Sequence, residues 1–290
     1  MLCLIIFWGS SFVVVKTLLL QGLTPISIAT FRFLVAGALF FVALLLQKFR
    51  KPQSATTFEG KDILVVIGLS LVGVTFFFIL QCIGIDLAGA SIASILVCFL
   101  SPILIALFSF RIFNEKLKKM QLMGIGVAAI GTLVVITGGS MDLKSSAPTF
   151  LLGSLILLLT PVLWASYTLG GKRLMEKYNP FLVVAYVNIV GGLFLLPFSL
   201  AENSLHEIFT LSLPAWAAIL YLAVTCSFIG YSIWFYVMKR VKAAVTSSFL
   251  FAEPLVTVLF ATTFVAEPVT PPIIAGAFLI FASVLLITKR

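Results

Sequence analysis

Three ionisable side chains, Lys16, Arg32 and Glu253, lie inside long apolar runs of this 290-residue chain. A charge near the centre of a lipid bilayer costs several kcal/mol, roughly 2.5–3.5 on insertion scales, so such residues usually face a cavity or one another. Lys16 comes late in its run, where a long side chain can reach the membrane surface. Arg32 has two open roles: structural pairing with a carboxylate or a free carbonyl, and recognition of a substrate carboxylate.

Glu253 lies deepest of the three. It comes about nine residues into its run, or roughly 14 Å along a helix, which is close to the middle of a hydrocarbon core about 30 Å thick. Burial favours the neutral carboxyl group, whereas a nearby ammonium group favours the carboxylate. A carboxyl group under both influences can exchange a proton for a cationic substrate, so Glu253 is the candidate coupling residue. The alternative is a permanently protonated Glu253 that hydrogen-bonds to a neighbouring helix.

Aromatic, hydroxyl and amide side chains in the same runs complete a candidate substrate-binding set. Trp8 and Trp164 could instead anchor the chain at the membrane surface, as tryptophans often do. Pro102 and Pro254 are predicted helix breaks, because proline leaves the carbonyl four residues earlier without its helical partner. Such a carbonyl can accept a hydrogen bond from a ligand or from a neighbouring helix. Besides Arg32, the substrate-binding set is Trp8, Ser10, Ser11, Gln81, Trp164, Ser166, Tyr167, Tyr231, Trp234 and Thr246.

The chain offers little for catalysis. His206 is its one histidine and lies between Glu202 and Glu207 in a polar segment. The cysteines have no Cys-x-x-Cys spacing, and no zinc or phosphate-binding motif is present. We therefore predict no enzyme activity, no metal and no cofactor. The cysteines are interpreted as small buried hydrophobic residues: Cys3, Cys82, Cys98 and Cys226.

The elements that must position these residues follow from the composition. Hydrophobic residues make up 61% of the chain and charged residues 10%, against about 25% charged residues in a soluble domain. A soluble fold could not cover so much apolar side chain with groups that water tolerates. Soluble enzymes, nucleic-acid-binding proteins and disordered chains are excluded. The composition is typical of an all-α polytopic protein that lies in a lipid bilayer.

Hydropathy in windows of about 19 residues predicts ten transmembrane helices, because each apolar run approaches the roughly 20 residues that cross the hydrocarbon core. Barrel strands would alternate polar and apolar residues instead. The first run lacks a basic n-region and a cleavage site, so we interpret it as a retained span rather than a signal peptide. The predicted spans are 1–20, 26–46, 63–85, 89–111, 120–139, 149–170, 181–200, 214–238, 244–265 and 272–288.

Basic residues are concentrated on one side of these spans. Apart from Lys16, Arg32 and Lys144, every Lys and Arg lies after an even-numbered span or at the C-terminal end. The positive-inside rule then predicts that both termini are cytoplasmic in a cell inner membrane. The opposite side carries only Lys144 beside five of the ten acids: Asp86, Asp142, Glu202, Glu207 and Glu267.

The two halves of the chain resemble each other. Trp8-Gly9-Ser10-Ser11 is echoed by Trp164-Ala165-Ser166-Tyr167, and from the fourth span onward an offset of 152 residues pairs Pro102 with Pro254 and Glu115 with Glu267. We predict two five-helix repeats, over residues 1–139 and 149–290. Because five is odd, the second repeat must be inverted in the membrane, which is common among secondary transporters. A duplication kept only for packing is the alternative.

The Trp-Gly-Ser-Ser-Phe stretch at residues 8–12, the Pro-x12-Glu pattern in both halves and the five-plus-five arrangement resemble the EamA family of the drug/metabolite transporter superfamily. The resemblance implies a bacterial or archaeal inner-membrane carrier, usually an exporter of amino acids or related small metabolites. One departure concerns the carboxylate before the proline. Glu253 precedes Pro254, but Ser101 precedes Pro102, so a symmetric mechanism with two carboxylates is not expected.

We therefore expect a secondary transporter that exports small metabolites such as amino acids or related amines by alternating access, with proton coupling as an open option. The alternative is a non-transporting membrane enzyme or receptor that uses the helical bundle as a binding pocket. The expected partners are a small-molecule substrate and the lipid bilayer, without nucleic acid, and the chain is expected to act as a monomer or homodimer.

Overall fold

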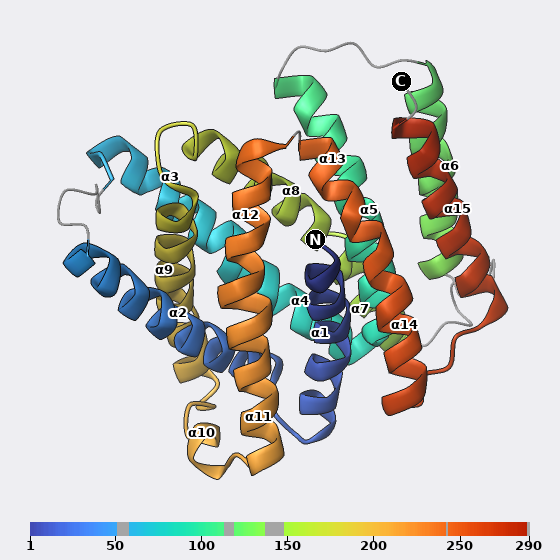
Figure 1. Ribbon diagram of the computed structural model, residues 1–290. Helices are drawn as coiled ribbons and strands as arrows, with labels where there is room; N and C mark the ends of the chain where they lie inside the picture. The colour runs from blue at the N-terminus through green and yellow to red at the C-terminus, as the bar shows by residue number, and fades with distance from the viewer. Residues whose placement is uncertain (51–57, 113–118, 137–147, 242, 289–290) are drawn as a thin grey trace.

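The computed structural model describes residues 1–50, 58–112, 119–136, 148–241 and 243–288. Within these ranges every regular element is helical (Figure 1), so the all-helical fold class is confirmed for this part of the chain. The elements are α1 (Leu2–Leu20), α2 (Pro25–Arg50), α3 (Gly60–Ser70), η1 (Leu71–Phe76), α4 (Phe77–Ala88), α5 (Ala90–Ile112), α6 (Lys119–Ile136), α7 (Pro148–Leu157), α8 (Thr160–Leu174), α9 (Pro180–Ala201), α10 (Glu207–Thr210), α11 (Leu213–Tyr221), η2 (Leu222–Ile229), α12 (Gly230–Arg240), α13 (Ala243–Ser247), η3 (Ser248–Ala252), α14 (Glu253–Phe264) and α15 (Pro271–Thr288).

Among the described residues, eight helical segments are long and apolar enough to cross a membrane. This confirms a polytopic membrane protein. Two further helices, α6 and α15, are apolar over the shorter described stretches Gly126–Val135 and Pro271–Ser283, so the count of ten spans stays a prediction. The eight segments are Leu2–Leu20, Pro25–Arg50, Gly60–Ala88, Ala90–Phe108, Pro148–Leu174, Pro180–Ala201, Leu213–Arg240 and Val245–Phe264.

Irregular turns interrupt several of these segments. η1 and η2 are π-helical turns inside the segments that correspond to the third and eighth predicted spans. Such turns often occur at functional sites. A 3₁₀ turn, η3, directly precedes Glu253 and Pro254. In contrast, α5 continues through Pro102, so the prediction of a helix break at that proline is corrected.

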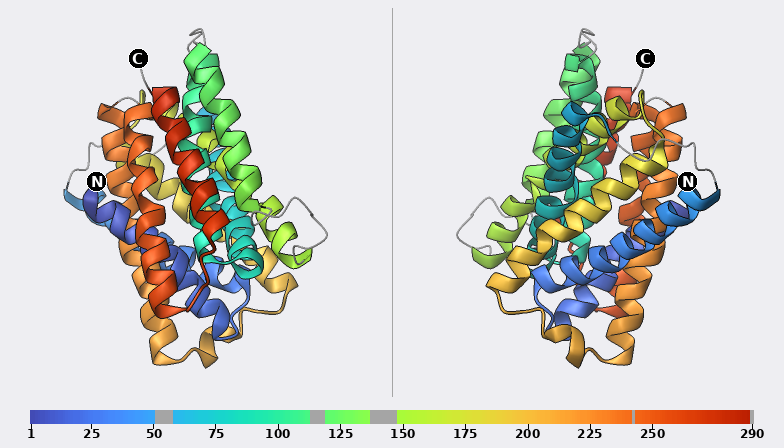
Figure 2. Two further views of the ribbon diagram at one scale, coloured as in Figure 1. Left: turned by 90° about the vertical axis from the view of Figure 1, so that its right-hand side faces the viewer. Right: turned by 90° about the vertical axis from the view of Figure 1, so that its left-hand side faces the viewer.

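The helices form one bundle with a peripheral pair at its edge. α6 and α15 lie side by side, as the left view in Figure 2 shows. A Cβ atom added to Gly131 on α6 would lie 2.8 Å from the carbonyl oxygen of Gly276 on α15, so glycine is required for this close approach. Nearer the centre of the bundle, α1 packs against α14 and α5 against α8.

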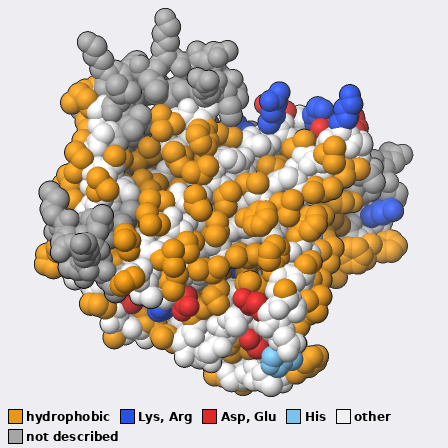
Figure 3. Space-filling view, turned by 180° about the vertical axis from the view of Figure 1, so that it is seen from behind, with side chains coloured by type: hydrophobic (Ala, Val, Ile, Leu, Met, Phe, Trp, Pro, Cys, Tyr) orange, Lys and Arg blue, Asp and Glu red, His pale blue; other side chains and the backbone are white. Residues whose placement is uncertain are grey.

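The outer surface is suited to lipid. Figure 3 shows apolar side chains across the middle of one face, with Lys, Arg and some acids at its upper edge and mainly Asp, Glu and His near its lower edge. Large exposed apolar side chains such as Leu64, Leu133 and Phe278 are at least 62% accessible, which in water would favour aggregation. In a lipid bilayer these side chains contact acyl chains instead of water, so their exposure is not unfavourable. Cys3 is also exposed, which corrects the prediction that all four cysteines are buried.

Candidate functional site

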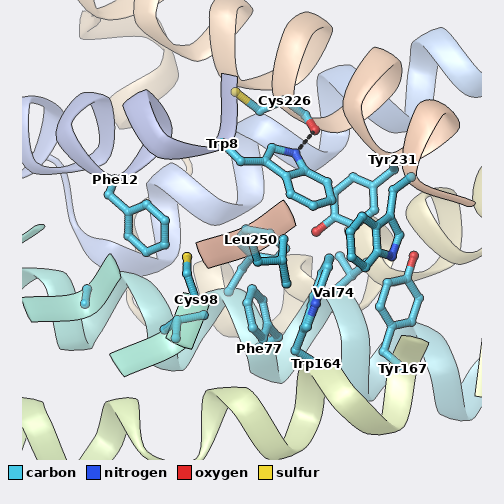
Figure 4. Close-up of a cluster of buried hydrophobic side chains, with 14 of the residues drawn as sticks. Trp8, Phe12, Val74, Phe77, Cys98, Trp164, Tyr167, Cys226, Tyr231 and Leu250 are labelled. Carbon is cyan, nitrogen blue, oxygen red and sulfur yellow. Dashed lines mark hydrogen bonds between the residues drawn. The ribbon is translucent and has the colours of Figure 1, made fainter. Parts of the chain in front are cut away.

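A small cavity lies in the middle of the bundle, and both halves of the chain contribute to it. Its volume is about 40 Å³, little more than the roughly 30 Å³ that one water molecule occupies in the liquid. Part of the surrounding cluster is drawn in Figure 4. The cavity is lined by Trp8, Ser11 and Phe12 of α1, Arg32 of α2, Phe77, Phe78 and Gln81 of α4, Val97, Cys98 and Ser101 of α5, Trp164 of α8, Tyr231 of α12, Leu250 of η3 and Glu253 of α14.

Aromatic rings form one wall of the cavity. The rings of Trp8 and Trp164, which occupy equivalent positions in the two halves of the sequence, meet edge to face with centroids 5.5 Å apart and planes at 88° (Figure 4). Trp8 also lies 5.6 Å from Tyr231 and 5.3 Å from Trp234. Distances of this kind are typical of favourable aromatic pairs. The wall therefore joins α1, α8 and α12 through direct ring contacts.

The indole of Trp8 also forms a hydrogen bond with the π-helical turn η2. Its Nε1 donates a hydrogen bond to the carbonyl oxygen of Cys226 at 2.9 Å, and the Cys226 thiol donates to the carbonyl oxygen of Phe7 at 3.1 Å. α1 and η2 are thus tied by a reciprocal pair of bonds. Because the two elements belong to different halves of the chain, this contact crosses the interface between them.

Three polar atoms near the aromatic wall have no hydrogen-bond partner among the described residues. They are the indole nitrogens of Trp164 and Trp234 and the hydroxyl of Tyr167, and all three are buried. Most buried donors in proteins are satisfied by protein or water. Of these groups only Trp164 lines the cavity, so its indole N–H is available to donate to water or to a ligand with acceptor oxygens.

Arg32 is buried, with 3% of its surface exposed. Its Nε donates to the hydroxyl of Ser227 in η2 at 2.8 Å, and the guanidinium carbon lies 4.5 Å from the centroid of the Phe78 ring and 5.2 Å from that of Phe33. Cation–π contacts stabilise the charge in part. Within the described residues, no carboxylate lies within ion-pair distance of Arg32. Its terminal N–H groups are therefore the cationic donors of the cavity.

Glu253 is equally buried, with 3% exposed, and begins α14. The thiol of Cys98 on α5 donates to its Oε2 at 3.1 Å. The backbone around Glu253 packs against Gly9 of α1, where an added Cβ atom would lie 2.9 Å from the Glu253 carbonyl oxygen. The Thr257 hydroxyl donates to the Gly9 carbonyl at 2.7 Å. These contacts fix the carboxyl group at the junction of α1, α5 and α14.

The structure brings together most of the residues that the sequence nominated. The cavity lining includes Trp8, Ser11, Arg32, Gln81, Trp164, Tyr231 and Glu253.

Five nominated residues lie outside the lining. Tyr167 and Trp234 pack behind the aromatic wall, against Trp164. Ser10 exchanges a hydrogen bond of 2.7 Å with the Tyr221 hydroxyl. Thr246 is buried in α13, and Ser166 is exposed on α8, with its hydroxyl bonded to the carbonyl of Val162. For Ser166 the prediction of a substrate contact is corrected.

Lys16 has a structural role. Its Nζ donates to the backbone carbonyl of Asp86 at 3.1 Å and to that of Ile85 at 3.4 Å, near the C-terminal end of α4. A cation at that end of a helix is favourable, because the last carbonyls have no helical partner and carry partial negative charge.

Sequence reasoning missed Phe78, Cys98 and Ser227. The first two are ordinary apolar residues in an apolar run, and the third lies in η2, a turn that no residue pattern announces. Only one weak signal existed, since Cys98 lies four residues before Pro102 and its carbonyl has lost its helical donor.

Comparison with known proteins gives a consistent picture. The sequence profile of the EamA-like transporter family matches twice, at residues 1–137 and 151–289. An uncharacterized transporter of Archaeoglobus fulgidus is 28% identical and aligns over 98% of this chain and 95% of its own. A probable amino-acid metabolite efflux pump of Salmonella typhimurium is 28% identical and aligns over 97% of this chain and 91% of its own. The uncharacterized inner membrane transporter YedA of Escherichia coli is 25% identical and aligns over 89% of this chain and 79% of its own.

A solved crystal structure shares the fold. It superimposes with a TM-score of 0.63 at 21% sequence identity and covers 99% of this chain and 96% of its own. The family profile accounts for nearly all of the chain, in two successive copies. The chain therefore belongs to the EamA-like transporter family.

Proposed function

We propose that this transporter exports small zwitterionic metabolites, amino acids or related amines, by alternating access, and that Glu253 couples export to protons. One observation carries the proposal. A buried guanidinium and a buried carboxyl group, those of Arg32 and Glu253, line the same cavity without pairing with each other in the described structure. Amino acids present a carboxylate and an ammonium group, which complement these two side chains.

The neighbouring donors favour the same substrate class. Trp164 lines the cavity with an indole N–H that has no partner among the described residues. It can add a hydrogen bond to a carboxylate held by Arg32. A substrate side chain would then contact the rings of Phe77 and Tyr231, which accept apolar and aromatic groups.

The size of the cavity favours a mechanism with moving halves. About 40 Å³ is little more than the roughly 30 Å³ of one water molecule, and even glycine has more non-hydrogen atoms than that space holds. Binding therefore requires the helices of one half to separate from those of the other, for example α1 of the first half from α14 of the second. Two inverted halves that pack in two mirrored ways would open the cavity to each side in turn.

Three features support an inverted repeat of ten spans. The family profile matches two successive stretches of similar length. The π-helical turns at Leu71–Phe76 and Leu222–Ile229 lie close to the sequence offset that relates the halves. The concentration of basic residues on one side agrees with an inner-membrane protein whose termini are both cytoplasmic.

The coupling step uses Glu253. A protonated Glu253 is compatible with an apolar site and can bond to Cys98 through either partner's hydrogen. Arrival of a substrate ammonium group stabilises the carboxylate and releases the proton. Reversal of these events on the opposite side would exchange one proton for one substrate cation.

Reconstituted vesicles test the proposal. Purified protein in proteoliposomes should accelerate counterflow of at least one labelled amino acid or amine, and Arg32→Gln and Glu253→Gln should each reduce it at least tenfold, as expected for the loss of one charge-assisted contact. Ser166→Ala, on the exposed face of α8, is the matched control and should transport normally. If no member of a panel of amino acids, amines and purines moves while a ligand still raises the melting temperature, the alternative of a membrane receptor or enzyme is favoured.

A further inference from the structure

A second groove lies away from the central cavity, where α9 begins and α12 ends. Its volume is about 500 Å³, more than ten times that of the cavity. Sites for small molecules commonly measure roughly 300–1,000 Å³. Phe181, Ile233 and Tyr236 line its sides, and Lys239 and Arg240 lie at its end. α9 and α12 pack against each other, and both of these ends lie at the top of the bundle in Figure 1.

The two cations are held in place by uncharged groups. Lys239 donates from Nζ to the backbone carbonyl of Tyr178 at 3.1 Å, and Arg240 donates from Nη1 to that of Tyr236 at 3.0 Å. The guanidinium of Arg240 also stacks 3.5 Å from the centroid of the Tyr236 ring. Each side chain keeps further N–H donors, since an ammonium group has three and a guanidinium group five.

A neighbouring lysine, unlike Lys239 and Arg240, has a carboxylate partner. Lys177 pairs with Asp62 at 3.3 Å, and this hydrogen bond raises the pKa of Lys177. Within the described residues, no such carboxylate partner lies beside Lys239 or Arg240, and the groove lining contains no acid. The end of the groove therefore carries two positive charges that no carboxylate of the described residues offsets.

The groove lies at the depth of lipid headgroups. Pro180–Ala201 and Leu213–Arg240 are both segments that can cross a membrane, and the groove lies where the first starts and the second ends. Tyr236 is 55% exposed there, as is typical of the aromatic belt at a membrane surface. Ile229, 37% exposed and one helical turn from Ile233 toward the membrane centre, extends the apolar wall.

We propose that this groove binds an anionic phospholipid of the adjacent leaflet. The phosphate lies between Lys239 and Arg240, and an acyl chain follows Phe181 and Ile233 toward the membrane centre. Basic pockets between transmembrane helices recognise anionic headgroups in this way. A free anion would use only the charged end, whereas a neutral lipid would use only the apolar wall. A lipid with a negative headgroup uses both.

Native mass spectrometry of the full-length protein tests the assignment. Phosphatidylglycerol should bind more tightly than phosphatidylcholine of the same acyl chains. In the double variant Lys239→Gln/Arg240→Gln, the dissociation constant for phosphatidylglycerol should rise roughly thirtyfold, because each cation near the surface contributes comparably to the binding. Arg240→Gln alone should give an intermediate value, and both side chains are exposed, so folding should be retained.

The matched control removes the same charge from another helix end. Lys48 and Arg50 are exposed at the end of α2, outside the groove, and Lys48→Gln/Arg50→Gln should leave the dissociation constant within about twofold. Equal losses in the two double variants would show nonspecific attraction and overturn the proposal. Equal binding of the two lipids by the unmodified protein would also overturn it. So would displacement of phosphatidylglycerol by inorganic phosphate at the same concentration, since the site would then recognise a free anion.

Discussion

The carboxylate of Glu267 accepts the backbone N–H of Ala90 at 2.7 Å, and its second oxygen accepts that of Ser91 at 2.9 Å. A residue that follows α14 thus caps the first turn of α5. A carboxylate is favourable there, because the first N–H groups of a helix have no helical acceptor. The same two helices meet again beside the cavity, where Cys98 bonds to Glu253. α5 and α14, one from each half, are therefore joined at two levels.

Loss of this cap should measurably weaken the fold. We expect Glu267→Gln to lower the free energy of unfolding by about 1–2 kcal/mol, because the variant loses the charge and one of two acceptor oxygens. Thermal unfolding of the purified protein in detergent measures the change. Glu202→Gln is the control, since Glu202 accepts a single bond of 3.1 Å from Thr24 at an exposed position. Equal shifts in the two variants would contradict a specific role for the Glu267 cap.

Gly89, directly before the helix start that Glu267 caps, should tolerate substitution poorly. Gly89 has a φ of 94°, which costs a residue with a side chain about 1–2 kcal/mol. Its added Cβ atom would also lie 3.0 Å from Oε1 of Glu267. We expect Gly89→Ala to lower the melting temperature. Gly68→Ala should be neutral or slightly stabilising, because Gly68 lies in α3 with nothing within 4 Å of the added atom. An unchanged melting temperature for Gly89→Ala would count against the observed turn.

Hydropathy located the helices well because burial in lipid demands long apolar runs. The predicted span 26–46, for example, lies within α2, Pro25–Arg50. It could not locate the turns η1 and η2, which depend on contacts between helices rather than on composition. α5 also remains helical through Pro102, as transmembrane helices commonly tolerate a proline.

The cavity residues were predictable to different degrees. Arg32 and Glu253 were identified because a charge inside an apolar run needs a special environment. Ser166 was assigned to the wrong face. A helix that is apolar all round has no amphipathic pattern, so its sequence does not show which face points inward. Adjacent residues such as Ser166 and Tyr167 point in directions about 100° apart, because a helix has 3.6 residues per turn.

Topology can be mapped with reporter fusions. The charge split predicts external reporters after Lys144 and Glu267 and cytoplasmic reporters after Lys51 and Lys118. Lys51, Lys118 and Lys144 lie outside the described residues, so the fusions supply independent information there. Alkaline phosphatase should be active only in the external fusions and green fluorescent protein only in the cytoplasmic ones. One clear reversal would undo the count of ten spans and the inverted repeat.

Replacement of Arg32 by lysine tests recognition of a carboxylate without removal of the charge. Lysine can neither bond to Ser227 from the same position nor lie flat over the Phe78 ring, as the guanidinium does. We expect Arg32→Lys to weaken binding of amino acids by about tenfold to a hundredfold, or about 1.4–2.8 kcal/mol, with a smaller effect on amines. Thermal-shift titrations measure both ligand classes. Arg173→Lys, at an exposed position in α8, should bind both normally, and equal losses for amines and amino acids in Arg32→Lys would argue against carboxylate recognition.

Replacement of Glu253 by glutamine separates a coupling role from a structural one. Glutamine has the shape of the protonated side chain and retains an oxygen that can accept the Cys98 thiol, so Glu253→Gln should unfold at nearly the same temperature as the unmodified protein. Within the described residues, no cation lies within ion-pair distance of Glu253. We therefore expect its ionisation in this buried site to depend on the arrival of a positive group, the proposed substrate ammonium.

We expect Glu253→Gln to retain some counterflow of substrate but to lose the acceleration that an imposed proton gradient gives, because glutamine cannot release a proton. Initial rates in proteoliposomes, measured with and without the gradient, report the difference. Glu176→Gln, an exposed acid outside the cavity, controls for the removal of a carboxylate and should respond to the gradient as the unmodified protein does. If Glu253→Gln also responds fully, the carboxyl group serves only as a hydrogen-bond partner between α14 and α5, and protons are coupled elsewhere or not at all.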